Sequence, residues 1–151
     1  MDGRKNGIWT WWFDSGIKQS EGHYVDDEQD GLWSYFSKDG SVAEEITFSG
    51  GKRDGRSTVW LTPEEKQEEK FYKNGKLDGP STFWENGYRS TMTTYKSDSP
   101  EGPWVIWFSN SDQIKEQGFH QKGIREGLTT YYYEDGTLSL IHISEPTRHH
   151  V

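Results

Sequence analysis

The sequence predicts an all-β protein, built as an elongated antiparallel sheet of tandem β-hairpin repeats of about 24 residues each. Three observations lead to this fold class. A turn-forming glycine recurs at a nearly constant interval, two columns of aromatic residues keep a fixed phase to it, and no segment shows helical periodicity. Internal repeats are examined first because a regular period of this length decides the architecture.

Six glycines, each preceded by Asn, Asp or Glu, mark the start of successive units. Glycine tolerates positive φ, and Asn-Gly or Asp-Gly pairs favour the tight turns that join antiparallel strands. The spacings between these glycines are 24, 24, 24, 23 and 25 residues. These anchors, which we assign as structural positions of the repeat, are Gly7, Gly31, Gly55, Gly79, Gly102 and Gly127.

Aromatic residues occupy two fixed positions in the unit. The fifth residue after every anchor is aromatic, and we assign this row as structural because it is never interrupted: Trp12, Phe36, Trp60, Trp84, Trp107 and Tyr132. A second column follows near the end of each of the first five units: Tyr24, Phe48, Tyr72, Tyr95 and Phe119.

Each unit is predicted to contain two short strands and two turns. The first strand follows the anchor, as in residues 31–36, and is rich in aromatic and hydroxyl residues with β propensity. A Gly-containing hairpin turn comes next in four units, at Gly16, Gly40, Gly87 and Gly136, and in the third unit Pro63 pre-sets φ for a type I turn. The second strand is represented by residues 44–48, and a longer turn such as residues 74–79 leads into the next unit.

The combination of an Asp-Gly-x-Trp start, a Gly hairpin turn, and an Asn-Gly-Lys-x-Asp-Gly connection resembles the MORN-repeat variant family of bacterial YwqK-type proteins. The resemblance covers residues 2–137, five full units and the start of a sixth, and implies a ribbon of successive hairpins. It departs from the pattern at Ser57 and Ser81, which replace an early Trp, and at Glu64, which replaces the turn glycine. Bacterial members of this family carry an antitoxin label.

Both ends of the chain carry features that the repeat does not explain. Gly3 holds the place that Gly51 and Gly75 hold before later anchors, so the chain opens inside an inter-unit turn. Residues 138–148 (LSLIHISEPTR) resemble a translated sequencing adapter. We therefore expect a MORN-like array at 1–137, a non-native or disordered tail at 138–151, and a fragment, of metagenomic origin, of a longer array. The alternative for the tail is a genuine apolar strand. With the true N-terminus expected upstream, a cytoplasmic and a secreted or lipoprotein location both stay open.

Composition excludes several classes of function. The net charge is −8, which argues against nucleic-acid binding and against binding to acidic lipid surfaces. There is no Cys, so disulfides, thiol nucleophiles and Cys-bound zinc are excluded. No apolar run is long enough to span a membrane as a helix. Aliphatic residues are scarce, but the 23 aromatic residues argue against disorder.

The residue pattern predicts no catalytic, metal-binding or cofactor-binding site. His23 and His120 fall in different phases of the repeat, and no nucleophile–base–acid spacing or metal motif is complete. We therefore predict that the array is not an enzyme and carries no cofactor. An acidic cluster at residues 26–30 is expected to be a solvated turn. A column of carboxylates is expected to protect the sheet against aggregation, with recognition of a basic partner as the alternative; it comprises Glu21, Glu45, Glu69 and Glu116.

Side chains alternate along a strand, so residues two and four after an anchor share one face (the +2/+4 face) and residues three and five share the other (the +3/+5 face). Both faces carry aromatics, and a single sheet cannot bury both. The +2/+4 row varies between units, which favours it as the binding surface. The candidate partner-binding residues are Trp9, Trp11, Trp33, Tyr35, Phe83, Trp104 and Tyr131.

Regularly spaced aromatic residues suit an extended ligand. The sequence favours a non-catalytic scaffold for protein–protein interaction, with an unidentified protein or a second copy of the chain as partner. One alternative is a glycan-binding or choline-type cell-wall module. Another is an array that positions the catalytic part of a larger enzyme.

Overall fold

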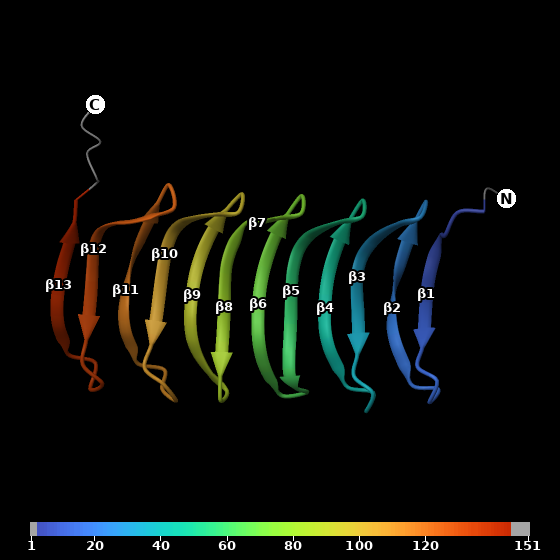
Figure 1. Cartoon of the computed structure of the whole chain (residues 1–151), viewed down its shortest axis with the longest axis horizontal. Coiled ribbons are helices and arrows are strands. Elements are labelled where there is room, and N and C mark those ends of the chain that lie inside the picture. The colour runs from blue at the N-terminus through green and yellow to red at the C-terminus, as the bar shows by residue number, and fades with distance from the viewer. Residues whose placement is uncertain (1–2, 146–151) are drawn as a thin grey trace. The chain divides into compact units, whose positions relative to one another are not determined.

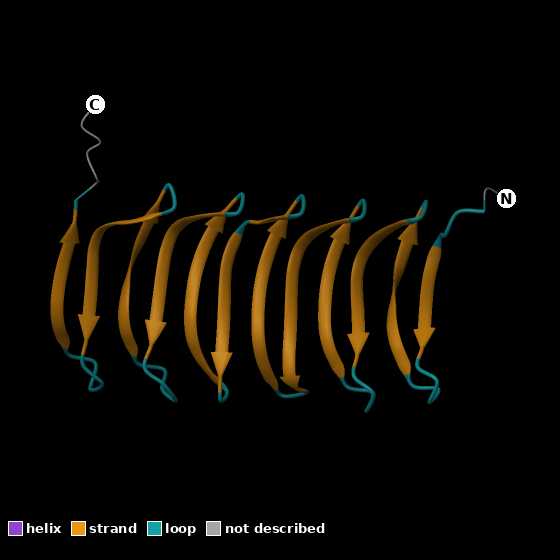
Figure 2. Cartoon of the chain, in the orientation of Figure 1, coloured by secondary structure: helices purple, strands orange, loops and turns teal. Residues whose placement is uncertain are grey.

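The structure, a computed structural model, describes residues 3–145 of the chain. Over this range the backbone forms strands joined by turns and bends, with no helix (Figures 1 and 2). The chain divides into two compact units, Met1–Leu77 and Asp78–Val151, which are described separately below. The predicted all-β fold of tandem hairpins is confirmed.

In both units the strands follow one another in chain order, and each pairs antiparallel with the next (Figure 1). Unit 1 contains β1 (Gly7–Trp12), β2 (Lys18–Val25), β3 (Glu28–Phe36), β4 (Val42–Ser49), β5 (Lys52–Thr62), β6 (Glu65–Lys73) and the short β7 (Lys76–Leu77), which pairs with β6. Unit 2 contains β8 (Gly79–Glu85), β9 (Tyr88–Lys96), β10 (Ser99–Trp107), β11 (Ile114–Gln121), β12 (Ile124–Tyr132) and β13 (Leu138–Ser144).

The turns between hairpins are tighter than the sequence suggested. Asn74 and Gly75 form the whole turn, with φ of 49° and 81°, and the residues after them already pair with β6. Asp26 and Asp27 do the same, with φ of 48° and 70°. Positive φ at both central residues is the type I′ geometry, whose twist matches that of the flanking strands. The expected longer turn over 74–79 is therefore wrong, because a two-residue turn suffices.

Four of the anchor glycines, Gly31, Gly55, Gly102 and Gly127, lie at an irregularity in strand pairing. Between β2 and β3, Glu21 pairs with Ser34, but His23 pairs with Asp30, so three residues of β3 face one residue of β2. Gly31 is within this bulge and has φ of 72°. All six anchor glycines have positive φ, which L-residues rarely adopt, and this explains why the anchor position is glycine in every unit.

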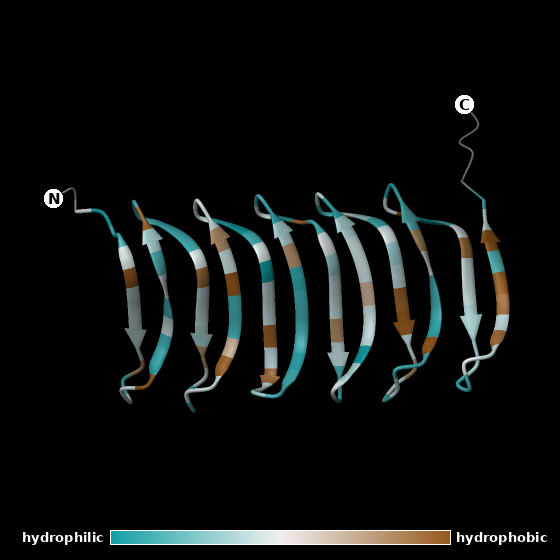
Figure 3. Cartoon of the chain, turned by 180° about the vertical axis from the view of Figure 1, so that it is seen from behind, coloured by the Kyte–Doolittle hydropathy of each residue, from teal (hydrophilic) through white to brown (hydrophobic). Residues whose placement is uncertain are grey.

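The +2/+4 face holds most of the core of both units. Trp33 and Trp104 are each only 2% exposed, and Ile46 is buried beside Trp33. In the hairpins without a Trp at this position, the buried +2 residues are small: Ser57, Ser81 and Thr129. Polar residues interrupt the apolar ones along the strands of both units, and β6 is hydrophilic over most of its length (Figure 3). The core is therefore a row of single large side chains rather than a continuous aliphatic layer.

Two glycines make room for the buried tryptophans. A Cβ at Gly22 would lie 2.1–2.5 Å from ring atoms of Trp33, and a Cβ at Gly118 would lie 2.8 Å from the Trp104 ring. The Trp33 ring also donates a hydrogen bond from Nε1 to the carbonyl oxygen of His23, at 3.1 Å. A sheet one layer thick can bury an indole here because the neighbouring residue has no side chain.

The segment from residue 138 forms β13, which pairs with β12 from Leu138 to Ser144. Six of its seven residues are exposed, among them Leu140 and Ile143. By contrast, β1 has three half-buried residues, and every other strand with more than two residues has at least four half-buried or buried residues. The non-native origin of residues 138–148 stays a prediction, because a foreign sequence can still add a strand to a sheet. Residues 146–151 lie outside the described part of the chain.

Candidate functional site

The largest aromatic cluster within one unit lies on the +2/+4 face of β1, β2 and β3. Trp33 lies at its centre, with ring centroids 4.9 Å from Tyr24 and 5.6 Å from Trp11. Trp9 contacts Trp11 at 6.1 Å, and Tyr35 contacts Trp33 at 6.3 Å. The rings meet tilted or edge to face, the arrangements that aromatic pairs prefer. Unit 1 therefore brings together four of the predicted partner-binding residues in one cluster.

The rings of this cluster differ in accessibility. Trp33 is buried, Trp9 is 39% exposed, and Trp11, Tyr24 and Tyr35 are half-buried. Trp9 and Trp33 occupy the same repeat position, but only Trp33 has a paired strand on both sides. The open surface of the cluster is thus formed by rings that rest on one buried indole.

The ammonium group of Lys5 lies over three of these rings. Its Nζ atom is 5.0 Å from the ring centroid of Trp9, 5.7 Å from that of Trp11 and 5.0 Å from that of Tyr24. The backbone of Lys5 is fixed by two hydrogen bonds with the turn residue Asp27, one from Lys5 N to Oδ1 at 2.7 Å and one from Asp27 N to the Lys5 carbonyl oxygen at 3.0 Å. We call Trp9, Trp11 and Tyr24 the aromatic cage.

The remaining predicted partner-binding residues lie in unit 2 and form no such cluster. Phe83 is 38% exposed and Tyr131 is half-buried. Trp104 is buried under the guanidinium of Arg125, which lies 4.0 Å from its ring centroid. The expectation that Trp33 and Trp104 are exposed binding residues is therefore wrong, because a glycine beside each lets the neighbouring backbone cover the indole.

One predicted repeat position is displaced in unit 2. The hairpin loop between Trp107 and Ile114 has one residue more than the loop between Trp12 and Lys18, and this shifts β11 by one residue. As a result Phe119 pairs with Pro103, faces away from Trp104 and is 60% exposed. The assignment of Phe119 to the second aromatic column is wrong, since a shift of one residue reverses the direction of every side chain.

His120 takes the place that Phe119 was expected to fill. Its ring centroid lies 6.1 Å from that of Trp104, and its Nδ1 is buried without a hydrogen-bond partner among the described residues. Burial and, secondarily, the positive charge of Arg125 lower the pKa of His120 below its usual value. His120 therefore packs against Trp104 in surroundings that disfavour its charged form.

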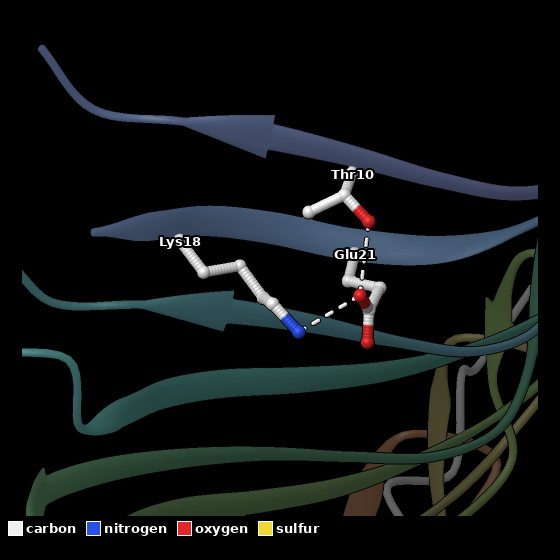
Figure 4. Close-up of polar contacts among 3 residues, drawn as sticks. All are labelled: Thr10, Lys18 and Glu21. Atoms are coloured by element: carbon white, nitrogen blue, oxygen red, sulfur yellow. Dashed lines mark hydrogen bonds and ion pairs between the residues drawn. The ribbon is translucent and has the colours of Figure 1, made fainter. Parts of the chain in front are cut away.

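The +3/+5 face carries a second arrangement, in which Lys18 lies between two aromatic rings and a carboxylate. Lys18 Nζ is 2.8 Å from Glu21 Oε2, which also accepts a hydrogen bond from Thr10 Oγ1 at 2.9 Å (Figure 4). The same ammonium lies 6.0 Å from the Trp12 ring centroid and 5.7 Å from that of Phe36. The hydrogen bond from Lys18 and that from Thr10 hold the pKa of Glu21 below its usual value.

The predicted carboxylate column follows this face only in unit 1. Glu45 pairs with Ser34 and Glu69 pairs with Thr58, as Glu21 pairs with Thr10. In unit 2 the shift of β11 turns Glu116 to the other face, opposite Ile106. The column is therefore shorter than the sequence suggested, and in unit 1 two of its members are paired with lysines.

The aromatic residues five positions after each anchor, which were assigned as structural, differ in burial. Trp107 is buried, whereas Trp12 is 60% exposed. Phe36, Trp60, Trp84 and Tyr132 are half-buried. The structural role of this row stays a prediction.

Within residues 3–145, no group of three or more His, Asp or Glu side chains is arranged to hold a metal ion. The same part of the chain contains no helix that is long and apolar enough to cross a membrane. His23 belongs to unit 1 and His120 to unit 2.

A comparison with known families finds one repeat family that matches parts of the chain. Three segments match the MORN repeat variant. They are residues 5–26, 29–49 and 125–142. The first two cover the hairpins β1–β2 and β3–β4, apart from the first residue of β3, and these hairpins carry the aromatic cluster. The third covers most of β12 and β13. The MORN repeat variant is a non-catalytic type of repeat module. No curated protein matches the chain.

Proposed function

We propose that this chain is a non-catalytic repeat scaffold that binds a protein partner through the +2/+4 face of its first two hairpins. The observation that carries the proposal is the cluster of half-exposed rings, Trp9, Trp11, Tyr24 and Tyr35, supported by the buried Trp33. Large aromatic side chains held rigidly in one conformation lose little entropy on binding and are enriched where interfaces concentrate their energy. An antitoxin-like role, in which a toxin is the bound protein, is one form of this proposal.

The aromatic cage also favours a second candidate, a choline-type wall-binding module. Aromatic cages recognise quaternary ammonium groups by cation–π attraction, and three rings here surround an ammonium group. A panel of choline and wall glycans distinguishes the two candidates. The wall-binding function predicts saturable binding of these compounds, and the protein scaffold predicts none at comparable concentration.

The scaffold is tested by capturing a protein partner, purifying it and measuring its Kd for three variants. Trp9→Ala and Tyr35→Ala remove rings from the cluster, and Trp12→Ala is the matched control because it removes an exposed ring from the opposite face of β1. We expect Trp9→Ala to raise Kd by about tenfold or more, as for a central interface aromatic, and Trp12→Ala to leave Kd unchanged. The proposal fails if neither cluster variant weakens binding or if the control weakens it equally.

A further inference from the structure

We infer that the aromatic cage is a recognition site for a lysine ammonium of a basic partner, and that Lys5 occupies it when the partner is absent. The inference rests on the proposed scaffold function and specifies the chemistry of the partner. Its structural basis is the position of Lys5 Nζ, 5.0–5.7 Å from three ring centroids.

The cage differs from the other cation–ring contacts at the same repeat position. Lys5 lies two residues before its anchor, as do Arg53 and Arg125. Arg53 lies over one ring, that of Tyr72 at 5.2 Å, and Arg125 lies over one ring, that of Trp104 at 4.0 Å. The first hairpin surrounds the cation with three rings because it has Trp at both the second and the fourth position after the anchor.

Lys5 is held in place by hydrogen bonds of its backbone, and its side chain makes none of them. The hydrogen bonds between Lys5 and Asp27 involve only the backbone N–H and C=O of Lys5. Equivalent bonds from the turn fix Gln29 and Arg53, through Gly51 N at 2.9 Å and Gly75 N at 2.8 Å. The Lys5 side chain can therefore leave the cage by rotating about its own bonds, while the strand and the turn stay in place.

Charge next to the cage favours a basic polypeptide over a quaternary ammonium ligand. The turn that follows Tyr24 contains four carboxylates within five residues: Asp26, Asp27, Glu28 and Asp30. The first three are exposed, and Asp27 is in direct contact with Lys5. A trimethylammonium group uses only the rings, whereas a lysine within a basic segment also places neighbouring cations against this turn.

The test titrates the full chain with a synthetic peptide of alternating lysine and glycine, and follows the indole N–H signals of Trp9 and Trp11 by NMR. The control peptide carries acetylated lysines, which keep the shape and lose the charge. We expect the lysine peptide to shift the signals saturably and the acetylated peptide to bind at least about tenfold more weakly. Equal binding of the two peptides would overturn the inference.

Lys5→Ala removes the internal competitor, so it should tighten binding of the lysine peptide by about two- to fivefold, corresponding to a cation–π contact at an exposed site. Arg53→Ala is the matched control, because it removes a cation at the same repeat position from a single ring. Trp9→Leu, which keeps an apolar side chain in β1, should weaken binding strongly. An affinity unchanged by Lys5→Ala and by Trp9→Leu would place the peptide elsewhere and contradict the cage assignment.

Two further outcomes separate this inference from the scaffold itself. Choline binding more tightly than the lysine peptide would replace the inference by the wall-binding function. A captured partner that depends on Trp9 but binds equally well after acetylation of its lysines would leave the scaffold standing and refute the lysine site.

Discussion

The contact between Gly22 and Trp33 gives the most direct test of the packing in unit 1. In Gly22→Ala, the new Cβ would lie 2.1 Å from the nearest atom of the indole ring. Carbon atoms in favourable contact are about 3.5–4.0 Å apart, so the ring must move by more than about 1 Å. Trp33 cannot do so freely, because Tyr24 and Trp11 pack against it at 4.9 Å and 5.6 Å.

The size of the effect follows from three contributions. Overpacking a filled core costs about 1–3 kcal/mol. Full loss of the packing of a large aromatic would cost about 3–5 kcal/mol, which sets the upper limit. Alanine is better than glycine within a strand by about 0.5–1 kcal/mol, which offsets part of the cost. Because the approach of 2.1 Å is severe, we expect an overpacking cost near the top of its range, so that Gly22→Ala lowers the free energy of unfolding by about 2–2.5 kcal/mol after the offset.

The assay is urea unfolding of the full chain, followed by far-UV circular dichroism and tryptophan fluorescence. The control is the same substitution in a Trp33→Ser background, since the chain itself places Ser57 at this position next to Ile46. In that background Gly22→Ala should be neutral or slightly stabilising. The packing argument is refuted if Gly22→Ala changes the stability by less than about 0.5 kcal/mol, or if its cost is the same in both backgrounds.

Three other predictions concern the remaining contacts. Gly118→Ala should destabilise by about 1–2 kcal/mol, less than the substitution in unit 1, because its Cβ would lie 2.8 Å from the Trp104 ring; equal urea midpoints for this variant and the parent would contradict this. His120 has a lowered pKa in the folded chain, so the unfolded chain binds its proton more readily; stability should be full above the unfolded pKa near 6.5 and decline as the pH falls through the folded pKa. His120→Gln should therefore flatten the fall in thermal midpoint between about pH 7.5 and 5.5, and an unaltered fall would exclude His120 as its source. Glu21→Gln should change stability by no more than about 0.5 kcal/mol, because its contact with Lys18 is partly exposed; a larger loss by urea unfolding would show that this ion pair is more than a surface contact.

The hairpin repeat could be predicted from the sequence because its signals are local. A turn is specified by the residues within it, and the alternation of side chains follows from the strand itself. The period of the anchors and the aromatic row after them therefore predicted the tandem order of the hairpins. The sequence predicted too long a turn between hairpins. Both central residues of the actual two-residue turn, such as Asn74 and Gly75, adopt positive φ, and the sequence pattern did not indicate this.

The register in unit 2 was less accessible to sequence reasoning. Counting from the anchor placed Phe119 and Glu116 in the same columns as their counterparts in unit 1. The hairpin loop after Trp107 is one residue longer, and pairing across the hairpin, not distance from the anchor, decides which face a residue joins. A comparison of hairpin-loop lengths between units would have revealed the changed register of β11.

The sequence by itself determined that this protein is an array of antiparallel hairpins with aromatic residues on both faces. Only the tertiary structure decided which of those aromatics are buried. Trp9 and Trp33 hold the same repeat position, yet one is 39% and the other 2% exposed. The difference arises because Trp33 has a paired strand on both sides, and Gly22 in one of them leaves the space that the Trp33 ring fills. Burial depends on neighbours that are distant along the chain, whereas a repeat pattern records only the positions within one unit.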